Sequence, residues 1–223
     1  LQVVAKNLIA NKEYVCQQNS PVVDVIHGTG RIILLYNKQE HSEFELAESK
    51  GTSRIFCIVS DDNGASWHSE KDISAQVHRR SQWRVQRPTL GHAIQLRSGR
   101  LFFAGMMTVS DNSVFQSQNY VFWSDDLGET WTIGGIIPYI GLNEATATEL
   151  ENGDIMINSR AYRDEKPIGL RAITIGHFVD DNTMEFDDTY FDKTLIDPSI
   201  QASLIRYSYS HQSQFGSKTR LLF

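Results

Sequence analysis

A glutamate and an arginine flank one turn signal in the segment NEATATELENGDIMINSRAY, residues 143–162. The Asn-Gly pair at 152–153 predicts a β-hairpin, and two loop lengths are open. A two-residue turn would set Glu144 opposite an alanine. A three-residue loop through residues 151–153 sets Glu144 directly opposite Arg160, so the loop length decides which chemistry the hairpin can carry.

We favour the three-residue loop, with Gly153 at positive φ and Leu150 paired with Asp154. Residues directly opposite on paired strands share a face, with Cβ atoms about 5 Å apart. Two interpretations of Glu144 and Arg160 then remain. They form a cross-strand salt bridge on a solvent-facing hairpin, or they form half of a pocket that binds an anion. The residues alone favour the salt bridge.

Two similar octapeptides, SDDNGASW at 60–67 and SDDLGETW at 124–131, carry paired aspartates, and their first residues lie 64 residues apart. In each copy the serine and the second aspartate can hydrogen-bond backbone groups of a tight turn. The glycine supplies positive φ, and the tryptophan returns to the core. The residues concerned are Ser60, Asp62, Gly64 and Trp67 in the first copy and Ser124, Asp126, Gly128 and Trp131 in the second. A calcium or magnesium loop is the rival interpretation, but neither copy has the alternating acids and distal glutamate of a helix-flanked calcium loop.

The composition is that of an ordinary globular protein, with 223 residues of which 40% are hydrophobic and 22% are charged. This length fits one domain or two. The net charge of −6 comes from interleaved acidic and basic residues, which gives no reason to expect a nucleic acid partner or an anionic membrane. The two cysteines, Cys16 and Cys57, imply no disulfide framework. No apolar run approaches the roughly 20 residues that span a bilayer.

Short β-branched and aromatic runs alternate with turn residues along the whole chain, and no long stretch has a helical period. The expected strands are residues 31–37, 54–60, 92–96, 100–107, 119–124, 143–150, 154–162, 170–176 and 202–208. A repeat of 64 residues that holds about four strands fits a propeller blade better than a pair of sandwich strands. The predicted fold class is therefore all-β, a β-propeller with about three to four blades represented.

The octapeptides are Asp-boxes, and the segments around them resemble the successive core segments of bacterial and animal sialidases. The segments that carry the resemblance are SPVVDVIHGTGRIILLYN at 20–37, LGHAIQLRSGRLFF at 90–103, YVFWSDDLGETW at 120–131 and the hairpin at 143–162. Their order and spacing match over nearly the whole chain. The resemblance implies a six-bladed propeller, and a degenerate third box is expected at residues 180–186.

The resemblance also assigns roles to the hairpin residues. Sialidases release terminal sialic acid through a tyrosine nucleophile that a neighbouring glutamate activates, and three arginines hold the substrate carboxylate. A neutral tyrosine suits this task because the carboxylate next to the attacked carbon would repel an anionic nucleophile. By position in the motif, Glu144 is similar to the activating glutamate and Arg160 to the second arginine.

Four further residues have expected roles in sugar binding or in the structure. Gln18 occupies the position of a sugar-binding asparagine in the family, although Asn19 replaces the proline that usually follows. Gln201, in the segment IQAS, resembles a glutamine that lines the family's pocket. His92 is expected to make a strand or loop hydrogen bond, and Cys57 is expected to be a buried small side chain.

The resemblance implies that the chain, residues 1–223, is the central part of one sialidase-like propeller domain, truncated at both ends. The acid/base aspartate, two of the three arginines and the nucleophilic tyrosine have no counterpart here, so this chain alone is expected to be inactive. The implied partners are sialylated glycans, glycoproteins or glycolipids. No metal and no cofactor is expected, and the family suggests a secreted, periplasmic or lysosomal location.

Two other functions remain open from the sequence. A non-catalytic Asp-box propeller could bind carbohydrate or protein, with Glu144 and Arg160 as a structural pair. An Asp-box hydrolase could instead act on neutral glucans, which would call for paired carboxylates along a groove with stacking aromatic residues.

Overall fold

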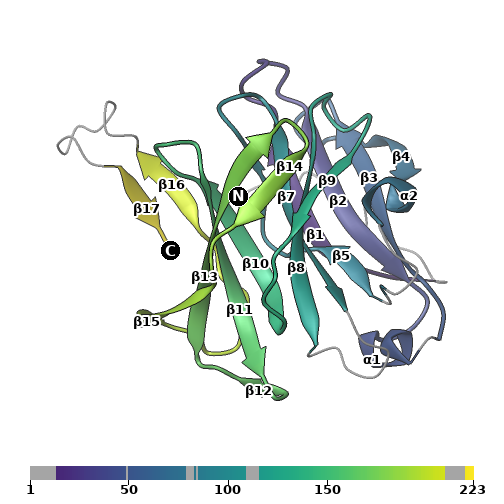
Figure 1. Cartoon of the computed structure of the whole chain (residues 1–223). Helices are drawn as coiled ribbons and strands as arrows, with labels where there is room; N and C mark the ends of the chain where they lie inside the picture. The colour runs from purple at the N-terminus through teal and green to yellow at the C-terminus, as the bar shows by residue number, and fades with distance from the viewer. Residues whose placement is uncertain (1–13, 49, 79–82, 84, 109–115, 209–218) are drawn as a thin grey trace.

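The computed structural model describes residues 14–48, 50–78, 83, 85–108, 116–208 and 219–223. Its regular structure is almost entirely antiparallel β, in three sheets of four or more strands and one separate pair of strands (Figure 1). The two helices of these residues, α1 (Glu43–Ala47) and α2 (Ser74–Val77), are short, and neither could cross a membrane. The predicted all-β class is confirmed.

The first sheet joins four strands in chain order. They are β1 (Val15–Val23), β2 (Ile32–Gln39), β3 (Ser53–Ser60) and β4 (His68–Asp72). The apolar strands β2 and β3 match the strands predicted at 31–37 and 54–60, whereas the hydrophobic pattern does not predict β1 or β4. The sequence of β4, HSEKD, has no hydrophobic residue, and its strand conformation comes from pairing with β3 at the edge of the sheet.

The second and third sheets repeat this four-strand order with additions at their margins. The second contains β5 (Gln86–Pro88), β7 (Leu101–Thr108), β8 (Ser117–Ser124) and β9 (Thr132–Ile136), with β6 (Ile94–Gln95) paired to β7. The third contains β10 (Leu142–Glu149), β11 (Ile155–Arg163), β13 (Leu170–Asp180) and β14 (Thr183–Phe186), with β12 (Lys166–Pro167) and β15 (Tyr190–Ile196) added. A last pair is β16 (Ile205–Ser208) and β17 (Arg220–Leu222). Four strands per repeat is what the 64-residue spacing predicts.

Some strand boundaries differ from the sequence prediction. The strand expected at 92–96 is reduced to Ile94–Gln95, and the strand expected at 202–208 begins only at Ile205. Strand β13 runs on to Asp180, beyond the expected end at residue 176, because it forms a hairpin with β14. Polar edge strands and hairpin extensions depend on their partners, so a hydrophobic pattern does not reveal them.

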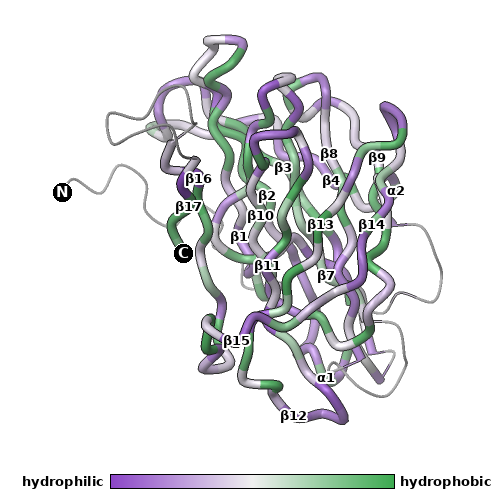
Figure 2. The backbone as a smooth tube through the Cα atoms, turned by 60° about the vertical axis from the view of Figure 1, so that its left-hand side comes forward, coloured by the Kyte–Doolittle hydropathy of each residue, from purple (hydrophilic) through white to green (hydrophobic). Residues whose placement is uncertain are grey.

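Two hydrophobic clusters lie on the two faces of the second sheet. Leu101 and Phe103 of β7 face the cluster shared with the first sheet, and Phe102 and Ala104 face the cluster shared with the third. This alternation follows from the two-residue period of a strand. All eight residues of β7 are buried, and stretches of hydrophobic residues run along the central strands (Figure 2).

Both Asp-boxes form the predicted turn, between the third and fourth strands of their sheets. In the second box the Ser124 hydroxyl donates to Asp126 at 2.8 Å and accepts the Gly128 N–H, also at 2.8 Å. The Trp131 indole donates to the Gly128 carbonyl at 3.2 Å, with Gly128 at φ +95°. The first box repeats these bonds with Ser60, Asp62, Gly64 and Trp67. The second aspartate of each box is thus a structural brace.

The first aspartate of each box has a different partner. Asp61 accepts two hydrogen bonds from the Arg31 guanidinium, at 2.7 and 3.2 Å, and Asp125 accepts two from Arg100, at 2.7 and 2.9 Å. Each arginine stands at the beginning of the second strand of its own sheet. Within the part of the chain that the structure describes, no group of three or more metal-ligating side chains gathers at these turns or elsewhere.

The expected third box at 180–186 lies in the matching place between β13 and β14. It is a tight turn in which Asp180 pairs with Thr183 and the Asn182 N–H donates to the Asp180 carboxylate at 2.7 Å. This turn lacks the glycine and the tryptophan of the motif. It shares with the two boxes only its position in the sheet and a hydrogen bond to an aspartate.

Candidate functional site

The candidate site lies at the end of the sheets opposite the Asp-boxes. Strands β3 and β8 lead into the boxes, whereas β10 starts at the other end, where α1 and β12 also lie (Figure 1). Glu144 is the third residue of β10, and Arg160 stands near the end of the antiparallel β11. The separation of the boxes from Glu144 follows from these strand directions.

Glu144 and Arg160, here called the acid–arginine pair, form a direct ion pair. The Arg160 Nη1 donates to Glu144 Oε2 at 2.9 Å, and the two side chains are 22% and 15% exposed. The predicted projection of both from one face is therefore confirmed. A carboxylate and a guanidinium held together at this depth can bind an anion or organise a hydroxyl group.

The hairpin that carries the pair has the predicted register with one departure. Leu150 N–H donates to the Asp154 carbonyl at 2.7 Å, Gly153 has φ +94°, and Ala145 pairs with Ser159 as the three-residue loop requires. Between Leu142 and Ala145 the register shifts by a β-bulge. The expectation that Glu144 sits in a regular pair opposite Arg160 is wrong in that detail, and their side chains meet across the bulge.

Buried polar groups hold this bulge. Asn119 of β8 donates from its side-chain amide to the Asn143 carbonyl at 2.6 Å and accepts the Ser159 hydroxyl at 2.8 Å. The Asn143 side chain accepts the Glu144 N–H at 2.9 Å. The local backbone at Glu144 is therefore set by groups from two sheets, which the hairpin sequence alone does not reveal.

Arg160 has hydrogen-bonding capacity left over. Its Nε is buried and has no hydrogen-bond partner among the described residues. Its guanidinium carbon lies 4.8 Å from the ring centroid of Tyr162, whose hydroxyl meets Ser199 at 3.2 Å. An aromatic face beside a guanidinium restrains its plane and leaves its edge for a ligand.

Arg87 of β5 is a second cation near the acid–arginine pair, and no sequence motif points to it. Its side chain is 4% exposed, Nη1 donates to Glu43 of α1, and Nη2 lies 3.5 Å from the Met106 sulfur. Burial lowers the pKa of Arg87 to about 10, while the charge of Glu144 acts in the opposite direction. Arg87 thus stays charged at neutral pH and adds positive potential near Glu144.

Arg171 is a third arginine near the pair, and it is buried between apolar neighbours in β13. Its guanidinium donates to both the side-chain and the main-chain oxygen of Asn158, at 2.6 and 3.2 Å, and to the Ile200 carbonyl at 3.0 Å. Asp197 lies 3.5 Å away, and burial lowers the pKa of Arg171 despite that charge. A charged residue inside an apolar strand pattern was a usable signal, because burying an arginine requires several partners.

The two candidate glutamines lie on separate segments. Gln18 is in the bulge of β1, at φ +57°, and its side-chain oxygen is buried with no partner among the described residues. Gln201 follows the Ile200 that Arg171 holds, and a Cβ added at Gly91 would lie 2.5 Å from its amide nitrogen. The described hydrogen bonds join neither glutamine to the acid–arginine pair.

His92 and Cys57 behave as expected. His92 Nδ1 lies 3.2 Å from the Ala93 carbonyl, and Nε2 lies 3.3 Å from the Ser203 hydroxyl. The Cys57 side chain is 1% exposed, and burial raises the pKa of its thiol to about 12. A thiol with so high a pKa is a packing group rather than a nucleophile.

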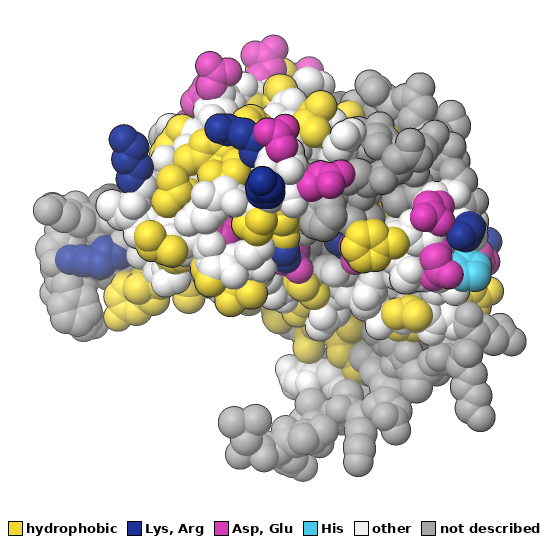
Figure 3. Space-filling model, turned by 90° about the horizontal axis from the view of Figure 1, so that it is seen from below, with side chains coloured by type: hydrophobic (Ala, Val, Ile, Leu, Met, Phe, Trp, Pro, Cys, Tyr) yellow, Lys and Arg dark blue, Asp and Glu magenta, His cyan; other side chains and the backbone are white. Residues whose placement is uncertain are grey.

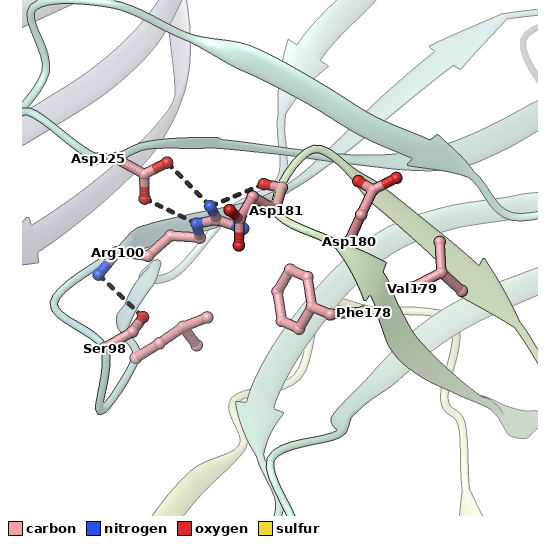
Figure 4. Close-up of a pocket in the computed structure, with 8 residues that line it drawn as sticks. Ser98, Arg100, Asp125, Phe178, Val179, Asp180 and Asp181 are labelled. Carbon is pink, nitrogen blue, oxygen red and sulfur yellow. Dashed lines mark hydrogen bonds and ion pairs between the residues drawn. The ribbon is translucent and has the colours of Figure 1, made fainter.

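A cavity of about 390 Å³ lies at the Asp-box end, away from the acid–arginine pair (Figure 4). Arg100 spans it, bound to Asp125 and to the Asp181 carbonyl at 2.8 Å, with its guanidinium 5.2 Å from the Phe178 ring centroid. These bonds tie the second box to the β13–β14 turn. The opposite face, which carries the candidate site, shows charged side chains of both signs among hydrophobic ones (Figure 3).

Comparison with known proteins finds sialidases in sequence and in structure. Residues 2–175 match the family described as BNR repeat-like domain. Human sialidase-4 is 28% identical over 168 residues, which cover 68% of this chain and 33% of that protein. The sialidase of Clostridium perfringens is 28% identical over 160 residues, which cover 69% of this chain and 41% of that protein. The chain thus spans between a third and two fifths of the length of these two relatives.

Solved structures show the same fold. The Hadza microbial sialidase Hz136 superposes with a TM-score of 0.74 at 23% identity, covering 95% of this chain and 40% of that one. The Trypanosoma rangeli sialidase, in a covalent intermediate with 2,3-difluorosialic acid, gives a TM-score of 0.66 at 15% identity, covering 94% and 35%. The three sheets are therefore those of a sialidase-like β-propeller.

Proposed function

We propose that this chain, which belongs to the BNR repeat-like domain family, is part of an enzyme that releases terminal sialic acid from glycans. Sialidases are its relatives in sequence and its neighbours in structure. In this role the substrates are sialylated glycans, glycoproteins or glycolipids.

The acid–arginine pair is the observation that carries the proposal. Glu144 holds Nη1 of Arg160, and the Arg160 side chain is 22% exposed, so N–H groups that Glu144 does not use can bind a carboxylate. Sialic acid supplies that carboxylate. Glu144 then accepts the proton of a tyrosine hydroxyl, which becomes the nucleophile toward the anomeric carbon.

A tyrosine nucleophile gives a covalent glycosyl–enzyme intermediate and hence retention of configuration. The Trypanosoma rangeli sialidase, a neighbour in fold, was solved as a covalent intermediate with 2,3-difluorosialic acid. Arg87 lies in electrostatic reach of Glu144 and adds positive potential to the region in which a substrate carboxylate would bind. Gln18 and Gln201 are proposed as sugar contacts.

We further propose that the chain is the central part of the propeller, and that the rest of the full-length protein supplies the tyrosine, the acid/base aspartate and two arginines. Apolar side chains are exposed at both ends of the row of sheets, among them Val15 at 49%, Ile196 at 69% and Ile200 at 59%. Exposed apolar edges of this kind are normally covered by neighbouring sheets.

The test uses the full-length parent with a fluorogenic α-sialoside, followed by NMR of the released sugar. The expected result is release of sialic acid with retained configuration, at the same rate with and without a chelator. Arg160→Lys should raise KM about tenfold or more, because lysine keeps the charge and loses the planar fork. Glu144→Gln should lower kcat by about 10²–10⁴ while KM changes little.

Arg54→Lys and Glu48→Gln are matched controls, because both side chains are more than half exposed and pair on the surface. Both should leave kcat and KM unchanged. A parent that cleaves no α-sialoside yet still binds sialylated glycans would favour the second candidate, a non-catalytic propeller. In such a propeller the ion pair between Glu144 and Arg160 would be structural rather than catalytic.

A further inference from the structure

We propose that Asn119, a buried asparagine of the second sheet, is the positioning residue that fixes the acid–arginine pair of the third sheet. This inference rests on the proposed function and adds a residue that touches neither Glu144 nor Arg160 in the hydrogen bonds described. Asn119 is 0% exposed and lies in the middle strand β8, beside β10.

Its side-chain amide uses both of its hydrogens and one acceptor position. Nδ2 donates to the Gly105 carbonyl at 3.1 Å and to the Asn143 carbonyl at 2.6 Å, and Oδ1 accepts the Ser159 hydroxyl at 2.8 Å. An amide is the side-chain group that offers two donors and an acceptor in one plane. These three bonds fix the amide orientation and anchor it to its own sheet through Gly105.

The two partners in the third sheet are the sequence neighbours of the pair. Asn143 directly precedes Glu144, and Ser159 directly precedes Arg160. One side chain therefore holds the backbone of β10 and a side chain of β11 at the level where the acid and the arginine project. No bond within the hairpin could set both positions relative to the second sheet.

The β-bulge explains why such an anchor is needed. Regular pairing stops between Leu142 and Ala145, and within this stretch the Asn143 carbonyl accepts the Asn119 amide at 2.6 Å. Bulges redirect a side chain and leave one backbone group to be satisfied elsewhere. Asn119 satisfies that carbonyl, and the direction of Glu144 follows from where the carbonyl is held.

The test compares Asn119→Leu, which keeps the volume and removes all three bonds, with the unaltered full-length parent. Active sites are counted by titration with a 2,3-difluorosialoside trap, and rates are measured well below the melting temperature of each variant. The expected loss is about 100-fold in kcat/KM per titrated site, since a displacement of about 1 Å is enough for such a loss. The loss should fall on both kcat, through Glu144, and KM, through Arg160.

Two further variants separate positioning from general stability. Ser159→Ala removes only the bond on the Arg160 side and should raise KM about fivefold with little change in kcat. Thr174→Val removes a part-buried hydrogen bond from β13 of the same sheet to Thr189, at 2.8 Å, and should lower the melting temperature without changing kcat or KM per site.

A crystal structure of the Asn119→Leu parent completes the experiment. The proposal expects Glu144 and Arg160 to be displaced relative to the second sheet. An unmoved pair, or unchanged kcat and KM per titrated site, would overturn the role of Asn119. If the unaltered parent cleaves no sialoside, the proposed function fails, and the position of the pair in that crystal structure still decides the role of Asn119.

Discussion

The paired aspartates of the Asp-boxes divide two tasks between adjacent residues. Asp62 and Asp126 brace their own turns, as the motif predicts from residue types alone. Asp61 and Asp125 bind arginines that lie about 25 to 30 residues earlier in the chain. The second task could not be predicted, because the octapeptide does not contain the partner.

Trp131→Ala should lower the free energy of unfolding by about 3–5 kcal/mol, as for other core aromatic residues. The indole is 5% exposed and packs at 5.3 Å, edge to face, on Phe103. Urea denaturation measures the change. Trp67→Ala is the matched control, because Trp67 holds the same place in the first box but is only half-buried, so its loss should be smaller. Equal losses at the two positions would contradict the assignment.

His177 should make the protein more stable at mildly acidic than at alkaline pH. Its two ring nitrogens lie 2.8 Å from Asp154 and 3.1 Å from Asp187, and the bond to Asp154, then that to Asp187, raises the pKa of the imidazole. A raised folded-state pKa gives stability that is fully present below the unfolded pKa of about 6.5 and is lost as pH rises through the folded value.

The comparison for this effect is between the native protein and His177→Gln. The difference in unfolding free energy should be larger at pH 5.5 than at pH 8.5, and it should be modest because the side chain is 38% exposed. His41→Gln, at an exposed histidine, should show no such difference. A His177→Gln effect that is equal at both pH values would refute the ion-pair explanation.

At the scale of elements, the hairpin at 143–162 shows what local sequence determines. The Glu-Asn-Gly loop and the register of five residue pairs, from Ala145–Ser159 to Glu149–Ile155, follow from the chemistry of the turn. The bulge at Glu144 does not, and the side chain that bonds the bulged backbone, Asn119, comes from another sheet. Local sequence therefore placed Glu144 and Arg160 on one face, and tertiary contacts decided how they meet.

Gly153→Ala should lower the free energy of unfolding by about 1–2 kcal/mol, because φ +94° is strained for any residue with a Cβ. Space is not the cause, since the nearest atom to an added Cβ, on Arg97, is 3.9 Å away. Gly153→Asn should cost less, since asparagine tolerates the left-handed region better. A loss from alanine no greater than that from asparagine, measured by urea denaturation, would contradict the turn geometry.

Several elements that the hydrophobic pattern does not predict are short or polar. Strand β4 and helices α1 and α2 are of this kind, and each is held by its surroundings. Helix α1 has a capping box at Ser42, but its place at the candidate-site end depends on the ion pair of Glu43 with Arg87. Such elements become visible only once the sheets that hold them are known.

For the whole molecule, the spacing of the two boxes was the most informative signal. It predicted four strands per repeat and an all-β propeller, and the three successive sheets agree. The arginines near the candidate site were harder to predict. Arg87 and Arg171 come from different sheets, and only the assembled fold brings their charges within electrostatic reach of Glu144.

The burial of β7 on both faces has a consequence for the exchange of backbone amide hydrogens with solvent. Amides of β7 and β8 should exchange in D₂O only when the whole protein unfolds, because two hydrophobic clusters must separate before water reaches them. Amides of β16 and β17, a pair with exposed Ile205 and Leu222, should exchange through local opening and much faster. Mass spectrometry of exchanged peptides should then show exchange rates that rise with distance from the second sheet. Equal protection along the whole chain would contradict this expectation.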